Sequence, residues 1–504
     1  MADTSARAAF ADLTPWARVA TSAGLGGMFA LGQAPFDLWP VALCGLAGLF
    51  LVLRQAVSPK QAAGTAWAFG AGYFGLSMMW IVEPFFVDAA VTGWMAPFAL
   101  VGLAGGLALF WAAPAWAAWR LRIPSLIVPF WALAELSRAY VLTGFPWGLV
   151  GYVWTPSPAA QWASLIGPHG LTVATLGLAA LAAHAAAVRN LYSGGFALAL
   201  GALLLGGGMA LTPALDDLSE RPLVRLVQPN APQDEKWRRD LVPVFFNRQI
   251  EATAAEPRPD LVVWPETALP GLLNHAGEAL AILEEAARGA SVVVGIQREE
   301  AGRYYNSAIT LGPEGGVVDV YDKHHLVPFG EYMPARWFFE HIEVSGLAAR
   351  AEGGFSAGPG PRLLDLGPLG AALPLICYEA VFPQDVGGAP ARPAMLLQLT
   401  NDAWFGTWSG PYQHLAQARM RAIEQGLPLL RSANTGVSAV IDRGGRVLAQ
   451  MPMGVHGHVD HAIPVAGPPT LYSRTGDLLA LGITLALALV LALCHDRLRG
   501  RDRP

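Results

Sequence analysis

The stretch Leu375-Ile376-Cys377-Tyr378-Glu379 places a thiol at the end of an apolar run that covers residues 369–376. Such a run predicts a buried strand, and Pro383 shortly after it indicates a turn or the start of a helix. Backbone N–H groups at such a turn favour an anion, either a thiolate or the oxyanion formed when a thiol attacks a carbonyl group. The same position also suits a core residue, because free cysteine is among the most buried residue types.

Two other apolar runs lead to a reactive side chain. Residues 261–264 lead to Glu266, and residues 317–321 lead to Lys323. Strand ends that share one edge of a sheet gather their side chains where α/β proteins usually form active sites. There, Glu266 would take the thiol proton, Lys323 would stabilise an oxyanion, and Cys377 would attack a carbonyl carbon. Taken singly, Glu266 could instead cap a helix and Lys323 could be a surface charge.

These runs belong to a region, residues 214–475, in which short β-branched runs alternate with helical patterns. The predicted strands cover residues 223–228, 261–264, 291–297, 307–311, 317–321, 369–376, 395–399, 437–442 and 447–451. The predicted helices cover residues 241–256, 276–288 and 412–425. This alternation predicts a layered α/β domain that is large enough to bury its own core.

The rest of the chain is strongly apolar. The 504 residues are 53% hydrophobic and 14% charged, with a mean hydropathy of +0.39, whereas soluble chains carry about 25% charged residues. We therefore expect a multi-pass helical membrane bundle in residues 1–213 and a last spanning helix with a basic tail in residues 476–504. About eight spans are expected, at residues 16–34, 38–54, 61–82, 94–118, 124–143, 161–188, 193–212 and 478–494.

Basic residues predict the orientation of these spans. They flank the first run, occupy alternate breaks and follow the last run, at Arg7, Arg18, Arg54, Lys60, Arg120, Arg122, Arg189, Arg497, Arg499, Arg501 and Arg503. By the positive-inside rule, both termini are expected in the cytoplasm and residues 214–475 on the opposite face. Residues 1–15 carry no cleavable signal pattern, so the first run is expected to remain as an anchor. Glu135 and Arg138, three apart in the fifth run, are interpreted as a mutual structural pair.

Composition also argues against several classes of function. The net charge of -5 includes no long basic block, which gives no indication of nucleic-acid binding. The three cysteines, Cys44, Cys377 and Cys494, cannot form a disulfide framework. No CxxC or HExxH pattern is present. We therefore expect neither a metal nor a cofactor.

The motifs around the three reactive residues resemble a known family. The stretches Trp264-Pro265-Glu266-Thr267, 321–332 and 376–379 resemble the nitrilase superfamily and, within it, the apolipoprotein N-acyltransferases. Further motifs fit the same resemblance, at residues 226–230, 236–237, 304–307, 400–405 and 431–436. The resemblance covers almost the whole chain.

The resemblance implies a nitrilase-like αββα sandwich in which Glu266, Lys323 and Cys377 form a catalytic triad. It implies support of the triad by Glu331 and Glu379, and an oxyanion-hole N–H from Tyr378. The residues that it implies in substrate binding are Trp237 and Asn306.

The activity implied is transfer of a fatty acyl chain from a phospholipid to an apolipoprotein, through a thioester on Cys377. The acceptor would be the amino group of an N-terminal diacylglyceryl-cysteine, on the periplasmic face of a bacterial inner membrane. Apolar residues 337–339 and the loop 346–360 suit either an approach to lipid or a core. One alternative is a membrane-tethered amidase or nitrilase that uses water as acceptor, although seven spans exceed what a tether needs. A transporter or receptor is a second alternative, but the spans carry few charges.

Overall fold

The computed structural model describes residues 13–334 and 354–501 and divides the chain into two compact units. The first unit contains Met1–Thr212, Trp408–Ala416 and Thr470–Pro504, and the second contains Pro213–Thr407 and Gln417–Pro469. Residues 337–339 and most of the loop 346–360, discussed above as a possible lipid contact, lie outside the described residues. Arg7 and Arg503, used for the orientation of the spans, also lie outside them.

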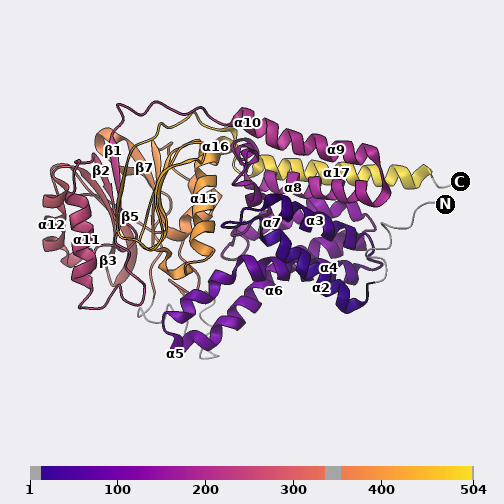
Figure 1. Ribbon diagram of the computed structural model, residues 1–504, viewed down its shortest axis with the longest axis horizontal. Coiled ribbons are helices and arrows are strands. Elements are labelled where there is room, and N and C mark those ends of the chain that lie inside the picture. Colours follow the sequence, from indigo (N-terminus) through magenta and orange to yellow (C-terminus); the bar gives the residue numbers. More distant parts are fainter. Residues whose placement is uncertain (1–12, 335–353, 502–504) are drawn as a thin grey trace. The chain divides into compact units, whose positions relative to one another are not determined.

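The first unit is a bundle of helices (Figure 1). Its α-helices are α2 (Pro15–Ala30), α3 (Trp39–Leu53), α4 (Pro59–Ser77), α5 (Ala89–Thr92), α6 (Ala96–Arg120), α7 (Ile127–Tyr140), α8 (Ala163–Val188), α9 (Leu191–Ala202), α10 (Gly208–Leu211), α16 (Leu471–Thr475) and α17 (Leu478–Arg501). Each apolar run predicted as a span overlaps at least one of these helices. The sequence patterns therefore indicate the positions of the longer helices of this unit, but they miss the short helices α5 and α16.

Four stretches of the described residues are long and apolar enough to cross a membrane, namely Ala89–Arg120, Pro158–Val188, Leu191–Leu211 and Leu478–Arg497. The expectation of about eight spans is therefore supported for four. The helices α2, α3 and α7 contain 16, 15 and 14 residues. At about 1.5 Å per residue, they are shorter than a hydrocarbon core of about 30 Å.

The charged pair inside α7, Glu135 and Arg138, is buried, and both side chains also form hydrogen bonds with other residues. Nη2 of Arg138 lies 3.1 Å from Oε2 of Glu135. Glu135 also accepts hydrogen bonds from Nε1 of Trp111 at 2.8 Å and from the N–H of Val150 at 3.2 Å. Arg138 donates to the carbonyl oxygen of Trp147 at 2.8 Å. The pair satisfies backbone groups of the loop after α7, which is a structural role.

The second unit contains two six-stranded sheets, in the orders β12-β1-β2-β3-β4-β5 and β11-β10-β9-β8-β7-β6. The strands are β1 (Leu223–Gln228), β2 (Leu261–Val263), β3 (Ser291–Glu300), β4 (Arg303–Leu311), β5 (Val317–Asp322), β6 (Leu364–Asp365), β7 (Ala371–Ile376), β8 (Met395–Thr400), β9 (Leu429–Ala433), β10 (Ser438–Ile441), β11 (Val447–Met451) and β12 (Gly457–Ala462). The sequence patterns predict nine of these strands and miss β6, β9 and β12.

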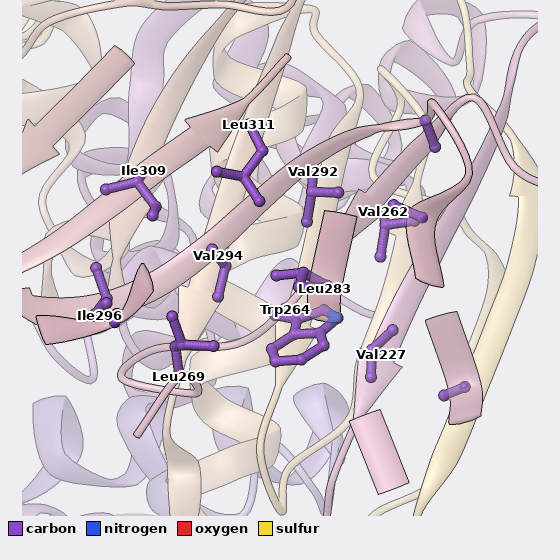
Figure 2. Close-up of a cluster of buried hydrophobic side chains, with 14 residues drawn as sticks. Val227, Val262, Trp264, Leu269, Leu283, Val292, Val294, Ile296, Ile309 and Leu311 are labelled. Carbon is purple, nitrogen blue, oxygen red and sulfur yellow. The ribbon is translucent and has the colours of Figure 1, made fainter. Parts of the chain in front are cut away.

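Helices and the two sheets form a layered α/β domain. The helices α11 (Val242–Ala254) and α12 (Gly277–Ala287) lie beside the first sheet, and the C-terminal part of α15 (Gly410–Gln425) lies beside the second (Figure 1). Oγ of Ser432, on β9, donates to the carbonyl oxygen of Val227, on β1, at 2.9 Å, which links the two sheets directly. Figure 2 shows the core beneath the first sheet, where Trp264 and Leu283 pack with valines and isoleucines of the strands.

Strand direction brings the ends of several strands to one edge of each sheet. In the first sheet, β1, β2 and β3 are parallel. Because β4 is antiparallel to both β3 and β5, β5 runs in the same direction as β2. In the second sheet, β7, β8 and β9 are parallel. Residues that directly follow β2 and β5, or β7, β8 and β9, therefore lie at a common sheet edge.

Candidate active site

Glu266 follows β2 and is held by bonds to both carboxylate oxygens. The residue is 6% exposed. Its Oε1 accepts a hydrogen bond from Nδ2 of Asn306 at 2.7 Å and lies 3.5 Å from Nζ of Lys323. Its Oε2 accepts from the backbone N–H of Asn401 at 2.9 Å. The side chain is a buried acceptor in a fixed orientation, as a general base requires.

Lys323 is the first residue after β5 and is almost fully buried. Its Nζ lies 2.8 Å from Oε2 of Glu331 and 3.5 Å from Oε1 of Glu266. Burial alone would lower the pKa of Lys323, but the carboxylates of Glu331 and Glu266 raise it, and the net change is upward. The ammonium group is therefore a permanent positive charge inside the site.

Cys377 is the first residue after β7 and begins a short 3₁₀ helix, η11 (Cys377–Val381). It is buried and has a φ of 51°, a left-handed conformation that costs about 1 to 3 kcal/mol for such a residue. Burial raises the pKa of the thiol, and Glu266 raises it further, whereas Lys323 and a hydrogen bond with Thr400 lower it. The net rise keeps the thiol protonated at neutral pH. Its proton must therefore pass to a base when the sulfur attacks.

Asn306 and Glu331 complete the cluster around the ammonium group. Asn306 lies on β4, and its Nδ2 donates to Oε1 of Glu266 at 2.7 Å and to Oε1 of Glu331 at 3.0 Å. Oε2 of Glu331 accepts the N–H of Val327 at 2.8 Å. The sequence resemblance implies substrate binding by Asn306, whereas its amide nitrogen joins two carboxylates here. Its Oδ1 has no hydrogen-bond partner among the described residues.

Glu379 joins the end of β7 to the end of β5. The residue is fully buried. Its Oε2 accepts the N–H of Ile376 at 2.7 Å, and its Oε1 accepts the Tyr321 hydroxyl at 2.7 Å and the N–H of His324 at 2.8 Å. This carboxylate fixes the backbone on each side of the site rather than the reacting groups themselves. The residue before it, Tyr378, is 5% exposed.

The rings around Tyr378 fix that side chain in place. Its ring centroid lies 4.8 Å from that of Phe382 and 5.6 Å from that of His325, both edge to face. The contribution of the Tyr378 N–H to an oxyanion hole stays a prediction. The ring packing gives its backbone a defined position next to the sulfur-bearing residue.

Trp237 lies on the segment between β1 and α11. It is 45% exposed and lines an apolar pocket together with Val242, Phe245 and Phe246 from the beginning of α11. Its neighbour Lys236 also lines this pocket, with Nζ 5.1 Å from the centre of the Trp237 ring. The exposed ring above apolar side chains is suited to contact an apolar ligand.

Two asparagines belong to the site although the sequence analysis, which includes them in the motifs 400–405 and 431–436, assigns them no role. Asn401 directly follows β8, and its N–H binds Glu266. Asn434 directly follows β9, and its Nδ2 donates to Oδ1 of Asn401 at 2.8 Å. The strand-end rule that indicates Glu266, Lys323 and Cys377 applies to both. It could have found Asn401, because β8 is a predicted strand.

The cluster combines a buried carboxylate, a permanent ammonium charge and a thiol whose charge both of them influence. Such a set can deprotonate a nucleophile, form a covalent acyl intermediate and stabilise the negative charge that develops on oxygen. Among residues 13–334 and 354–501, no group of three His, Cys, Asp or Glu side chains has an arrangement that could hold a metal ion. The chemistry of these side chains is that of acyl transfer.

Comparisons with known proteins cover nearly the whole chain. Residues 25–181 match the family described as Apolipoprotein N-acyltransferase N-terminal domain, and residues 223–466 match the family described as Carbon-nitrogen hydrolase. A protein of Rhodopseudomonas palustris named Apolipoprotein N-acyltransferase is 38% identical over an alignment of 522 positions that covers 96% of each chain. A protein of the same name from Caulobacter vibrioides is 40% identical over an alignment of 513 positions that covers 95% of each chain.

Among solved structures, an amidase of Nesterenkonia AN1 from the nitrilase superfamily is 19% identical and covers 52% of this chain and 95% of its own, with a TM-score of 0.35. The family assignment rests on the sequence relatives, whose similarity extends from the helical bundle through both sheets to the terminal helix. This chain belongs to the apolipoprotein N-acyltransferase family.

Proposed function

We propose that this chain transfers a fatty acyl group from a phospholipid to the N-terminal amino group of a diacylglyceryl-cysteine in apolipoproteins. The names of its relatives support the reaction and the acceptor. The observation that carries the proposal is the cluster at the edge of the sheets. In it, Nζ of Lys323 lies 3.5 Å from Oε1 of Glu266, and both side chains shift the pKa of the Cys377 thiol.

In the first half of the proposed reaction, the sulfur of Cys377 attacks the ester carbonyl carbon of the phospholipid. Glu266 takes the thiol proton as the carbon–sulfur bond forms. The carbonyl oxygen becomes an oxyanion, which the ammonium group of Lys323 and the N–H of Tyr378 stabilise. The ester carbon–oxygen bond then breaks, and Glu266 returns the proton to the departing lysophospholipid oxygen. The product is a thioester on Cys377.

In the second half, the amino group of the acceptor attacks the thioester carbon. Glu266 takes a proton from the attacking nitrogen, the carbon–sulfur bond breaks, and the sulfur regains a proton. A thioester suits this order of events because it reacts readily with amines. The amide product leaves the enzyme in its starting state.

The remaining residues have supporting roles in this proposal. Glu331 keeps Lys323 charged and Glu379 fixes the two strand ends. Asn306 orients the carboxylates of Glu266 and Glu331, and its Oδ1 is available to accept a hydrogen bond from the acceptor. Trp237 contacts the acyl chain at the pocket beside α11.

The membrane placement is part of the same proposal. Residues 1–213 form a seven-span bundle, residues 214–475 the catalytic domain, and residues 476–504 a last span with a basic tail. Four helices of sufficient length and hydropathy support a membrane location. The arginines and lysines support an inner membrane orientation with both termini in the cytoplasm and the catalytic domain in the periplasm.

The proposal is tested by intact-mass spectrometry of the purified protein in detergent with a phospholipid of one defined acyl chain. We expect the mass to rise by one acyl group in place of one hydrogen, and peptide mapping to place it on Cys377. A diacylglyceryl-cysteine peptide should remove the adduct and gain the same acyl group. Cys44→Ala and Cys494→Ala should still form the adduct, whereas Cys377→Ala should not.

Other outcomes would contradict the proposal in different ways. Release of the adduct by water alone, with no acylated peptide, would identify a hydrolase. Absence of any adduct in the wild-type protein would reject acyl transfer from phospholipid. A Lys323→Ala variant should lose acylation while it keeps its thermal unfolding transition, and a wild-type rate in that variant would remove Lys323 from the proposed mechanism.

A further inference from the structure

Lys236 is a buried cation that the proposed mechanism does not use. It lies on the segment between β1 and α11 and is 7% exposed. Its Nζ donates to the backbone carbonyl oxygen of Glu266 at 3.2 Å and to Oγ1 of Thr267 at 2.8 Å. Burial of an ammonium group is costly, and both of its bonds go to the turn that carries Glu266.

The turn that receives these bonds is strained. Thr267 has a φ of 46°, which is unfavourable for a β-branched residue. On the opposite side, the N–H of Ala268 donates to the carbonyl oxygen of Gly295 at 2.8 Å. A Cβ atom at Gly295 would lie 2.4 Å from the carbonyl oxygen of Pro265, so β3 packs directly against this turn. The turn is thus held between β3 and Lys236.

The segment of Lys236 is also connected to the carboxylate of Glu266. The Oε1 of Gln233 accepts from Nδ2 of Asn401 at 2.7 Å. The N–H of Ala231 donates to Oδ1 of Asn434 at 2.9 Å, and Asn434 binds Asn401. Because the N–H of Asn401 binds the carboxylate of Glu266, one segment contacts the backbone of Glu266 and, through asparagines, its side chain.

We propose that Lys236 is a positioning residue for Glu266 and that its positive charge is required for thioester formation on Cys377. The inference rests on the proposed function because it takes Glu266 as the base of that reaction. The charge-assisted hydrogen bonds from Nζ hold the strained turn in the conformation that directs the carboxylate. The ring of Trp237, over which the same ammonium group lies, connects this turn to the apolar pocket.

The charged groups around Lys236 define how it responds to pH. Glu266 is the carboxylate that faces it from the end of β2. Its own segment carries Asp234, Glu235, Arg238, Arg239 and Asp240, and α11 carries Arg248 and Glu251. Burial lowers the pKa of Lys236 to about 8, and the charge of Glu266 acts against this change. The ammonium group therefore loses its proton in mildly alkaline solution, where an arginine at this position would stay charged.

The test measures the rate of thioester formation on Cys377 between pH 6.5 and pH 9.5 in the full-length protein. In the wild-type protein, deprotonation of Lys236 should lower the acylation rate in a step near pH 8. Lys236→Met should lack this step and should acylate about ten- to a hundredfold more slowly at pH 7, because kcat falls while the KM for phospholipid is unchanged. Lys236→Arg should keep most of the rate and move the step to higher pH. The matched control is Arg239→Met, which removes an exposed cation of the same segment and should behave as wild type.

Two further measurements decide the remaining cases. Thr267→Val keeps the branched shape but removes the acceptor of the 2.8 Å bond, and it should acylate more slowly even if Lys236→Met does not fold. Wild-type rates in Lys236→Met or in Thr267→Val, or a persistent step near pH 8 in Lys236→Met, would overturn the inference. If the wild-type protein forms no adduct at all, the proposed function fails. Amide hydrogen exchange of residues 264–270 then tests whether Lys236 holds the turn that carries Glu266. Faster exchange in Lys236→Met than in Arg239→Met would then support positioning, and equal exchange would refute it.

Discussion

The carboxylate of Glu379 accepts a hydrogen bond from the backbone N–H of His324 at 2.8 Å, although 55 positions of sequence separate the two residues. The same carboxylate accepts the N–H of Ile376, which directly precedes Cys377. His324 directly follows Lys323. One buried side chain therefore fixes the distance between the strand that carries the thiol and the strand that carries the ammonium group.

Replacement of this carboxylate should weaken both stability and acylation. In Glu379→Gln, an amide NH₂ group would face one of the backbone N–H donors, which leaves a buried donor unpaired and costs about 1 to 3 kcal/mol. We expect a lower melting temperature and slower thioester formation. Glu285→Gln, which changes an exposed carboxylate on α12, should alter neither quantity. Unchanged acylation in Glu379→Gln would show that the strand ends are held by other contacts.

His324 should make the stability of the protein depend on alkaline pH. Burial alone would lower its pKa, but the nearby carboxylates of Asp385 and Glu379 raise it to about 9, above the value of about 6.5 in the unfolded chain. The folded protein thus binds the proton more tightly, so the stabilisation is complete below pH 6.5 and is lost as the pH rises through 9. The melting temperature should fall over this range by more in the wild-type protein than in His324→Gln. Parallel curves for the two proteins would rule out this role.

The effect of Lys236 on stability has the opposite sign. Its pKa is lower in the folded protein than in the unfolded chain, so its contribution to stability improves as the pH rises from about 8 to about 10.5. Because Lys236 is present in both the wild-type protein and His324→Gln, the difference between their melting curves isolates the histidine.

A negative charge at position 306 should slow thioester formation even when the size of the side chain is unchanged. Asn306→Asp replaces the donor between Glu266 and Glu331 with a third carboxylate, so two attractive contacts at 2.7 and 3.0 Å become repulsive. We expect at least about a tenfold loss in the rate of thioester formation. Asn247→Asp on α11 is the corresponding substitution away from the cluster. A rate in Asn306→Asp close to wild type would mean that the two carboxylates do not depend on this amide.

Asp402 and Arg431 form a buried ion pair beneath the site, and each side chain is fully buried. Asp402→Asn should cost about 3 to 5 kcal/mol because it leaves the guanidinium charge of Arg431 without its counter-ion. The double variant with Arg431→Met should recover part of this loss, because it removes the uncompensated charge. Thermal unfolding of the three variants in detergent measures the coupling. Additive effects of the two substitutions would contradict a direct interaction.

The positions of the proposed reactive residues could be inferred from sequence because each follows an apolar strand that is easy to recognise. Strands β2 and β7 are buried along almost their whole length, so they appear as continuous apolar runs. Strand β5 lies at the sheet edge and is partly exposed, and it is recognised instead by its β-branched residues Val317, Val318 and Val320. The common direction of β2 and β5 brings Glu266 and Lys323 to one edge of the first sheet. Cys377 follows β7 of the second sheet and lies close enough to both charges for them to shift its pKa. The roles of these residues still come from the resemblance and remain a proposal.

The elements that the sequence patterns miss have polar residues inside strands. In β9, Arg431 and Ser432 are buried, because Arg431 pairs with Asp402 and Ser432 bonds to β1. In β12, His458, Asp460 and His461 interrupt the apolar pattern at the sheet edge. The contact of Lys236 with Glu266 depends on how a long connection folds back onto the first sheet, and local periodicity contains no information about such a contact.

The pairing of β12 with β1 has a consequence for biosynthesis. Leu223 to Gln228 pair with residues near the end of the domain, and the buried guanidinium group of Arg225 bonds Asp460 at 2.6 Å. While the ribosome is still synthesising the domain, one edge of β1 therefore has no partner strand and Arg225 has no counter-ion. The first sheet closes only after translation has passed Ala462, so premature termination anywhere upstream of Gly457 yields a product with an open, aggregation-prone edge.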